Sequence, residues 1–169
     1  MKILSTERLL LRWLDSTDQD FIITLLNDRS FLDNIGDRGV RTKEDALRYI
    51  EKMQDTYRKQ GFGFYLVETH AKEKLGISGM IHRPGLSDPD IGFAFLPQHH
   101  GKGFARESAE AVKKMAIKEF QLNRLVAITS PENKDSIRLL GKLGLVFEKN
   151  ICLPGDTKVV ALFAWEKKE

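Results

Sequence analysis

The stretch that decides the fold is residues 90–112, DIGFAFLPQHHGKGFARESAEAV. Its first part alternates large apolar and small residues, which is typical of a β-strand, and Pro97 ends the ladder because proline has no N–H. A glycine-rich loop follows, and small residues then recur at helical spacing from Ala105 onward. The stretch therefore predicts a strand over 90–97, a tight loop and a helix over about 103–119.

Residues 124–130, RLVAITS, predict the next strand. A strand, a helix and a second strand in one sheet connect by a right-handed crossover, so these two strands should lie parallel. Further strands are predicted at 8–14, 63–69, 75–83, 145–150 and 158–166, and further helices at about 15–28, 42–60 and 133–144. Residues 29–40 contain two glycines and are interpreted as a loop. The pattern predicts a mixed α/β sheet, mostly antiparallel, with helices on its faces, and we expect one domain over residues 1–169.

The composition excludes several classes of protein. The 169 residues are 41% hydrophobic and 30% charged, as in soluble globular proteins, and no apolar run approaches the ~20 residues of a membrane span. We expect no signal peptide. The net charge of +3 is scattered, so no nucleic-acid partner is expected. The single cysteine, Cys152, cannot form an internal disulfide, which favours a cytoplasmic location, and we expect it to be a small buried residue.

The glycine-rich loop fits one of three phosphate-binding patterns. A Walker loop needs Ser or Thr after its lysine, whereas Lys102 precedes Gly103. A dinucleotide fingerprint needs a third small residue where Arg106 stands. The pattern Q-x-x-G-x-G-x-A over 98–105 instead leaves the first N–H groups of a helix uncovered, and these can hold a pyrophosphate without a metal. A Gly-x-Gly before a helix can also be a plain tight turn.

With this loop and two other stretches, the sequence resembles the GNAT acetyltransferases, and among them the RimJ/RimL-like ribosomal-protein N-terminal acetyltransferases. The other two stretches are TERLLLR at 6–12 and NKDSIRLLGKLGLVF at 133–147. The resemblance extends over nearly the whole chain, from Thr6 to Trp165. It implies a GNAT-type mixed, mostly antiparallel sheet in which a splayed parallel strand pair binds acetyl-CoA.

The resemblance also implies roles for individual residues. Backbone N–H groups of the loop would hold the pyrophosphate. The pantetheine arm and thioester carbonyl would pair with the end of the preceding strand, where we expect the Leu96 N–H to be free. Ser136, one helical turn from Asn133, would face the coenzyme sulfur. The implied coenzyme-binding residues are Phe95, Leu96, Gln98, Gly101, Lys102, Gly103, Phe104, Ala105 and Asn133. No metal site is expected.

The chemistry implied is acyl transfer from a thioester to an amine, which must be neutral to attack. Asp90 is the candidate base, acting through a water, although it stands where this family often has Glu and also fits a turn residue in S-D-P-D. Glu68 and His82 are other candidate bases, more simply interpreted as a strand-end charge and a packed or surface histidine. Ser136 is the candidate proton donor to the leaving thiolate.

The sequence thus predicts an acetyl-CoA-dependent N-acetyltransferase acting on a primary amine. A protein N-terminal α-amine is the first candidate acceptor and a small-molecule amine the second. A non-catalytic acyl-CoA-binding module is the alternative from another class. Both a monomer and a homodimer fit the sequence. The adjacent His99 and His100 are interpreted as loop surface or as packing against the coenzyme.

Overall fold

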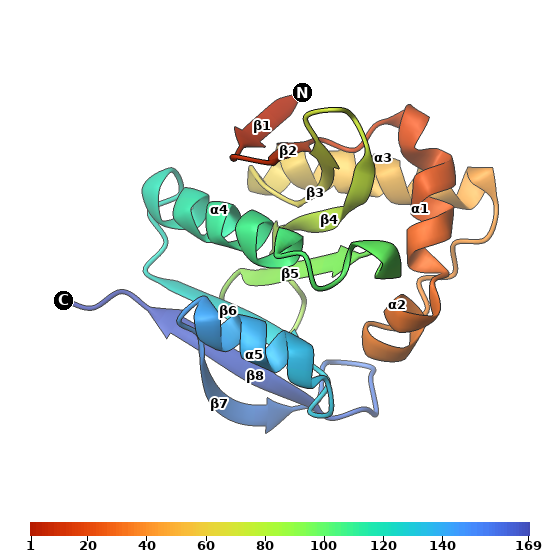
Figure 1. Cartoon of the computed structure of the whole chain (residues 1–169). Helices are drawn as coiled ribbons and strands as arrows, with labels where there is room; N and C mark the ends of the chain where they lie inside the picture. The colour runs from red at the N-terminus through yellow and green to blue at the C-terminus, as the bar shows by residue number, and fades with distance from the viewer.

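A computed structural model describes residues 1–169 and contains one eight-stranded sheet in the order β1-β2-β3-β4-β5-β6-β8-β7 (Figure 1). The strands are β1 Lys2–Ser5, β2 Leu9–Arg12, β3 Phe64–Thr69, β4 Lys74–Ile81, β5 Asp90–Phe95, β6 Arg124–Thr129, β7 Val146–Ile151 and β8 Val160–Glu166. The helices are α1 Gln19–Leu26, α2 Arg29–Asn34, α3 Lys43–Gln60, α4 Phe104–Lys118 and α5 Lys134–Lys142, with 3₁₀ turns at Ser16–Asp18 and Pro97–His99. All neighbouring strands are antiparallel except β5 and β6, which confirms the predicted mixed sheet.

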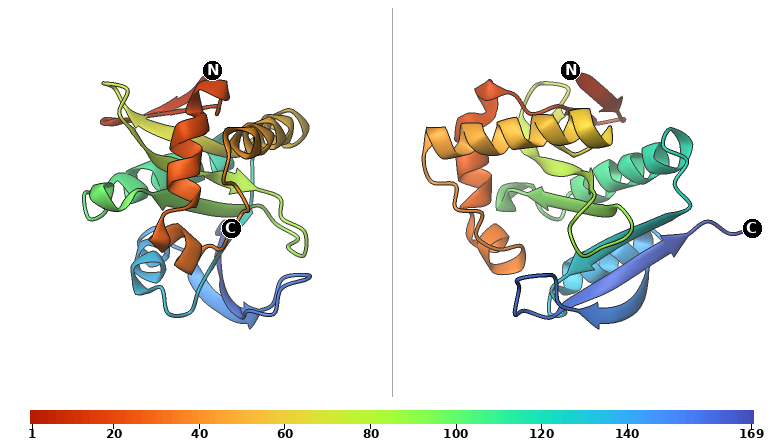
Figure 2. Two further views of the ribbon diagram at one scale, coloured as in Figure 1. Left: turned by 90° about the vertical axis from the view of Figure 1, so that its right-hand side faces the viewer. Right: turned by 180° about the vertical axis from the view of Figure 1, so that it is seen from behind.

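Helices cover both faces of the sheet. Helices α4 and α5 lie on one face, and α3 crosses the other, as the front and back views show (Figures 1 and 2). Helix α3 begins after Thr42, which forms a reciprocal capping box with Asp45, and Gly61 ends the helix at φ 86°. Helix α4 buries Ala109, Val112 and other small residues, so it can lie close to β4 and β5.

The parallel pair β5–β6 is joined at one end only. Asp90 and Val126 are its single pair of facing residues, whereas β4 and β5 share six from Ile81↔Asp90 to Gly76↔Phe95. Because both strands continue for several residues beyond that pair, they diverge toward the end of β5. This confirms the predicted splayed pair and leaves the later main-chain groups of β5 without a strand partner on that side.

Two sequence predictions about loops and burial are wrong, and one strand was missed. Residues 29–40 are not all loop, because Arg29–Asn34 forms helix α2, capped by the Asp28 side chain and anchored by buried Phe31. The strand β1 was not predicted; it pairs antiparallel with β2 although its residues are only half-buried or exposed. Cys152 is exposed, not buried, because the chain leaves the sheet after β7. No helix is long and apolar enough to cross a membrane.

Candidate active site

The loop between β5 and α4 forms a cradle of uncovered backbone amides. Gly101 and Gly103 have φ of 73° and 80°, in the left-handed region that glycine tolerates, and Gly103 is the N-cap of α4 without any side-chain cap. The N–H groups of residues 101–106 donate to no other group of the chain. Nothing lies within 4 Å of the Cβ position at Gly101, so the loop is open to a ligand. Unpaired amides at a helix start favour an anion, and the residues therefore fit a pyrophosphate.

The residue of β5 whose N–H is free differs by one position from the prediction. The Leu96 N–H donates to the Leu75 carbonyl on β4 at 3.0 Å, so the expectation of a free Leu96 N–H is wrong. Hydrogen-bonded and non-hydrogen-bonded pairs alternate in an antiparallel ladder, so the main-chain groups of Phe95 and Phe93 face the gap toward β6. Sequence reasoning missed Phe93, because the facing set is fixed by the β4 register.

The two histidines lie just before the cradle and contact residues on either side of it. The His100 Nε2 lies 2.8 Å from the Phe95 carbonyl oxygen, so the imidazole lies at the edge of β5 that faces the gap. The Phe95 N–H remains as the donor there. His99 is buried, not on the loop surface as one prediction had it, and its ring meets the Phe104 ring edge-on at 6.4 Å.

Asp90 lies at the closed end of the splayed pair. It is the first residue of β5, with a side chain only 3% exposed, so the interpretation as a turn residue is wrong. One carboxylate oxygen, Oδ2, lies 3.2 Å from the Arg83 Nε, and the other, Oδ1, is buried with no hydrogen-bond partner. Burial raises the pKa of Asp90, and the nearby positive charge of Arg83 opposes the rise without cancelling it. A raised pKa makes this carboxylate a stronger base than an exposed aspartate.

A tyrosine of α3 lies near Arg83, the basic partner of Asp90. Burial raises the pKa of Tyr49 in α3 to about 12, and the positive charges of Arg38 and Arg83 act against that rise. Tyr49 therefore stays protonated at neutral pH and can donate a hydrogen bond. Sequence reasoning missed Tyr49, Arg38 and Arg83, because they come from α3 and two separate loops. Glu68 does not belong to this group, because it is buried against Arg12 and Lys72.

Helix α5 presents the two predicted polar residues at its start. The Asn133 Oδ1 accepts a hydrogen bond from the Ser136 N–H at 3.2 Å, so Asn133 is the N-cap of α5. One lone pair of that oxygen is therefore used within the chain, and the side-chain NH2 group of Asn133 is free to donate to a ligand. The Ser136 side chain is half-buried, and its hydroxyl makes no hydrogen bond within the chain.

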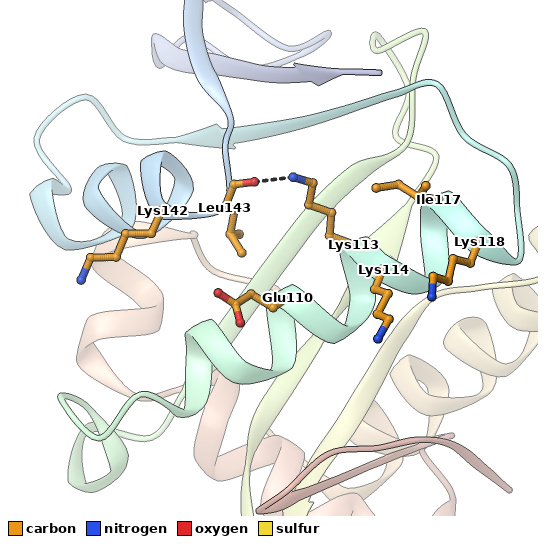
Figure 3. A pocket seen from close by; sticks show the side chains of 7 residues that line it. All are labelled: Glu110, Lys113, Lys114, Ile117, Lys118, Lys142 and Leu143. Carbon is orange, nitrogen blue, oxygen red and sulfur yellow. Dashed lines mark hydrogen bonds between the residues drawn. The ribbon is translucent and has the colours of Figure 1, made fainter. Parts of the chain in front are cut away.

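A separate pocket of about 320 Å³ lies between the later turns of α4 and the end of α5 (Figure 3). Its lysines are Lys113, Lys114, Lys118 and Lys142, and it contains none of the predicted site residues. The Lys113 Nζ donates to the Leu143 carbonyl at 2.5 Å and lies 4.8 Å from the Trp165 ring centroid, so it ties α4 to the end of α5. Nowhere in the chain do three His, Cys, Asp or Glu side chains gather as a metal site would require.

Comparisons with known proteins agree with this geometry. A family model described as an acetyltransferase (GNAT) domain matches residues 8–146. The uncharacterized N-acetyltransferase YnaD of Bacillus subtilis (strain 168) is 28% identical over 155 residues, which cover 89% of this chain and 88% of that protein. The crystal structure of a GNAT-family acetyltransferase from Bacillus anthracis superposes with a TM-score of 0.81 at 27% identity over 100% of both chains.

A more distant structure shares the same fold. RimL, a ribosomal L7/L12 alpha-N-protein acetyltransferase solved in complex with coenzyme A, superposes with a TM-score of 0.83 over 99% of this chain and 98% of its own, at 18% identity. The chain therefore belongs to the GNAT family of acetyltransferases, and it is an acyltransferase.

Proposed function

We propose that this enzyme transfers the acetyl group of acetyl-CoA to a primary amine, namely the α-amine at the N-terminus of a peptide or protein. The observation that carries the proposal is the buried, unpartnered Oδ1 of Asp90 at the point where β5 and β6 part. In this proposal residues 1–169 form a single acetyltransferase domain, and the single cysteine favours a cytoplasmic location.

The coenzyme would be held by main-chain groups. The cradle amides from Gly101 to Ala105, which include those of Lys102 and Phe104, would bind the pyrophosphate, with Gln98 beside them. The edge of β5 at Phe93 and Phe95 would pair with the pantetheine arm, and the free Asn133 amide would add one hydrogen bond. When bound, acetyl-CoA supplies an activated acetyl group as a thioester.

Asp90 would accept the proton of the attacking amine. A raised pKa makes a carboxylate a stronger base, which suits general-base catalysis. An α-amine has a pKa of about 8, so roughly a tenth is neutral at pH 7, whereas a lysine side chain with a pKa of about 10.4 is almost wholly charged. One carboxylate acting through a water is therefore better matched to an α-amine than to lysine.

Two further groups would stabilise the charges that develop during transfer. The Phe95 N–H faces the gap and would donate to the thioester oxygen, in the place of the Leu96 N–H, which is used within the sheet. The Ser136 hydroxyl makes no hydrogen bond within the chain and would donate to the leaving thiolate. Because the thiol has a pKa of about 8.5, the thiolate is already a fair leaving group, and the expected gain in rate is modest.

The assignment to the RimJ/RimL-like branch rests on the three sequence stretches that carry the resemblance.

The test is a product screen by mass spectrometry with acetyl-CoA and three acceptors. These are a peptide with a free N-terminus and no lysine, the same peptide N-terminally blocked with one lysine added, and a small polyamine. Acetylation of the first peptide alone supports the proposal. Preferential acetylation of the polyamine would move the acceptor to small molecules. Coenzyme binding without turnover of any acceptor would support a non-catalytic acyl-CoA-binding module instead.

A further inference from the structure

The turn between β1 and β2 is hydrogen-bonded to the first turn of α4, although the two segments lie far apart in the sequence. The Glu107 Oε1 accepts hydrogen bonds from the Thr6 hydroxyl at 2.6 Å and from the Arg8 N–H at 2.9 Å. The Glu107 Oε2 accepts from the Arg8 Nε at 2.7 Å. Glu107 therefore fixes both the backbone and the side chain of Arg8.

From this position the Arg8 guanidinium reaches the cradle itself. Its Nη1 donates to the Lys102 carbonyl at 2.9 Å, and its central carbon lies 4.5 Å from the centroid of the Phe104 ring. A Cβ added at Gly103 would lie only 3.2 Å from the Arg8 Nη2. One side chain thus contacts Lys102 and Phe104 and lies beside Gly103 between them.

Few other interactions hold the cradle in its shape. Its two glycines tolerate many conformations, its helix start has no side-chain cap, and its amides donate to no group of the chain. Although burial opposes it, hydrogen bonding to Thr6 and Arg8 lowers the pKa of Glu107, so this carboxylate stays ionised at neutral pH. Only the planar fork of arginine can bond a carboxylate and a carbonyl while its face covers a ring.

We propose that Arg8, held by Glu107, is a positioning residue that keeps the 101–105 cradle in its pyrophosphate-binding shape. A loop ordered before the coenzyme arrives loses less conformational freedom on binding. Arg8 also places a positive charge beside the cradle. The proposal rests on acetyl-CoA as the coenzyme and does not depend on which amine is the acceptor.

The test compares a coenzyme that has the pyrophosphate with one that lacks it. Arg8→Ala is assayed with acetyl-CoA and with acetyl-pantetheine, and CoA binding is measured by calorimetry. We expect the Kd for CoA and the KM for acetyl-CoA to rise about three- to tenfold, with kcat at saturation unchanged. We expect kcat/KM for acetyl-pantetheine to match the wild type, because that substrate does not use the cradle.

Matched variants separate positioning from general damage to the fold. Glu107→Gln should reproduce the loss in coenzyme affinity. Glu110→Gln, the same change one turn further along α4 in an exposed pair with Arg106, should not. Arg8→Lys retains the charge but not the fork and should recover only part of the affinity, and it replaces Arg8→Ala if that variant does not fold.

Three results would overturn the proposal. These are equal losses with both thioesters, an unchanged Kd for CoA in Arg8→Ala, and equal effects of Glu107→Gln and Glu110→Gln. A wild-type enzyme that binds no CoA would overturn the coenzyme assignment as well as this inference, so the two failures can be told apart.

Discussion

Replacing Asp90 with asparagine should make the enzyme slower and the fold more stable. The substitution keeps the shape of the side chain and removes both the negative charge and the proton-accepting oxygen. Loss of a positioned general base costs about a hundredfold to ten-thousandfold in rate. Because roughly a tenth of an α-amine is already neutral at pH 7, we expect the lower end of that range, about a hundredfold in kcat.

The effect on stability follows from the burial of the same carboxylate. Oδ1 is buried without a hydrogen-bond partner, so the negative charge of the ionised carboxylate is poorly stabilised in the folded chain. Because the pKa of Asp90 is raised in the folded state, its ionised form favours unfolding. At neutral pH the Asp90→Asn variant should therefore melt higher, by about 2–4 °C for each kcal/mol gained. The difference should vanish below about pH 3.9, where the carboxyl is protonated in both folded and unfolded chains.

The assays are initial rates with a peptide acceptor and thermal melts from acid to neutral pH. The matched control is Asp55→Asn, the same change in an exposed pair with Arg58, where we expect an unchanged rate and less than about 1 kcal/mol in stability. A wild-type rate in Asp90→Asn would refute Asp90 as the base. A lower melting temperature would refute the view that its ionised carboxylate destabilises the fold.

Three smaller predictions concern α5 and the cradle. Ser136→Ala should lower kcat by about tenfold and leave the KM for acetyl-CoA unchanged, because the thiolate is already a fair leaving group; stopped assays at saturating coenzyme measure this, and an unaltered kcat contradicts it. Asn133→Ala removes the N-cap and should lower the free energy of unfolding in urea by about 1 kcal/mol, whereas Asn133→Asp should retain most of it. A Cβ added at Gly141 within α5 would meet nothing within 4 Å, so Gly141→Ala should raise the free energy of unfolding by about 0.5–1 kcal/mol. Gly101 has a φ of 73°, so Gly101→Ala should lower the free energy of unfolding by about 1–2 kcal/mol. The same sign for both glycine variants in urea would contradict this account.

The elements that the sequence predicts well are those with a long periodic pattern. The buried residues of α3 recur every three or four positions between a capping box and a glycine, so both its existence and its ends were predictable. Strand β1 has only four residues and no fully buried side chain, and α2 has only six residues, so neither carries a clear period. Their formation depends on the neighbours against which they pack.

The candidate site was predicted at the level of the loop but not of individual atoms. The glycines and the helix start identify the cradle, because local conformation exposes the amides there. Which amide of β5 is free depends on the register with β4, and a shift of one residue moved this role from Leu96 to Phe95. The pairing of Arg8 with Glu107 joins residues 99 positions apart, and a single sequence gives no sign of it.

The most direct test of the coenzyme site is hydrogen exchange of individual amides, followed by NMR with and without acetyl-CoA. The amides of residues 101–106 and of Phe95 have no partner within the chain and should exchange slowly only when the coenzyme is bound. The Leu96 amide, bonded to Leu75, should be protected in both states. Fast exchange of the 101–106 amides at saturating acetyl-CoA, or new protection confined to the lysine-lined pocket around Lys113, would contradict the account.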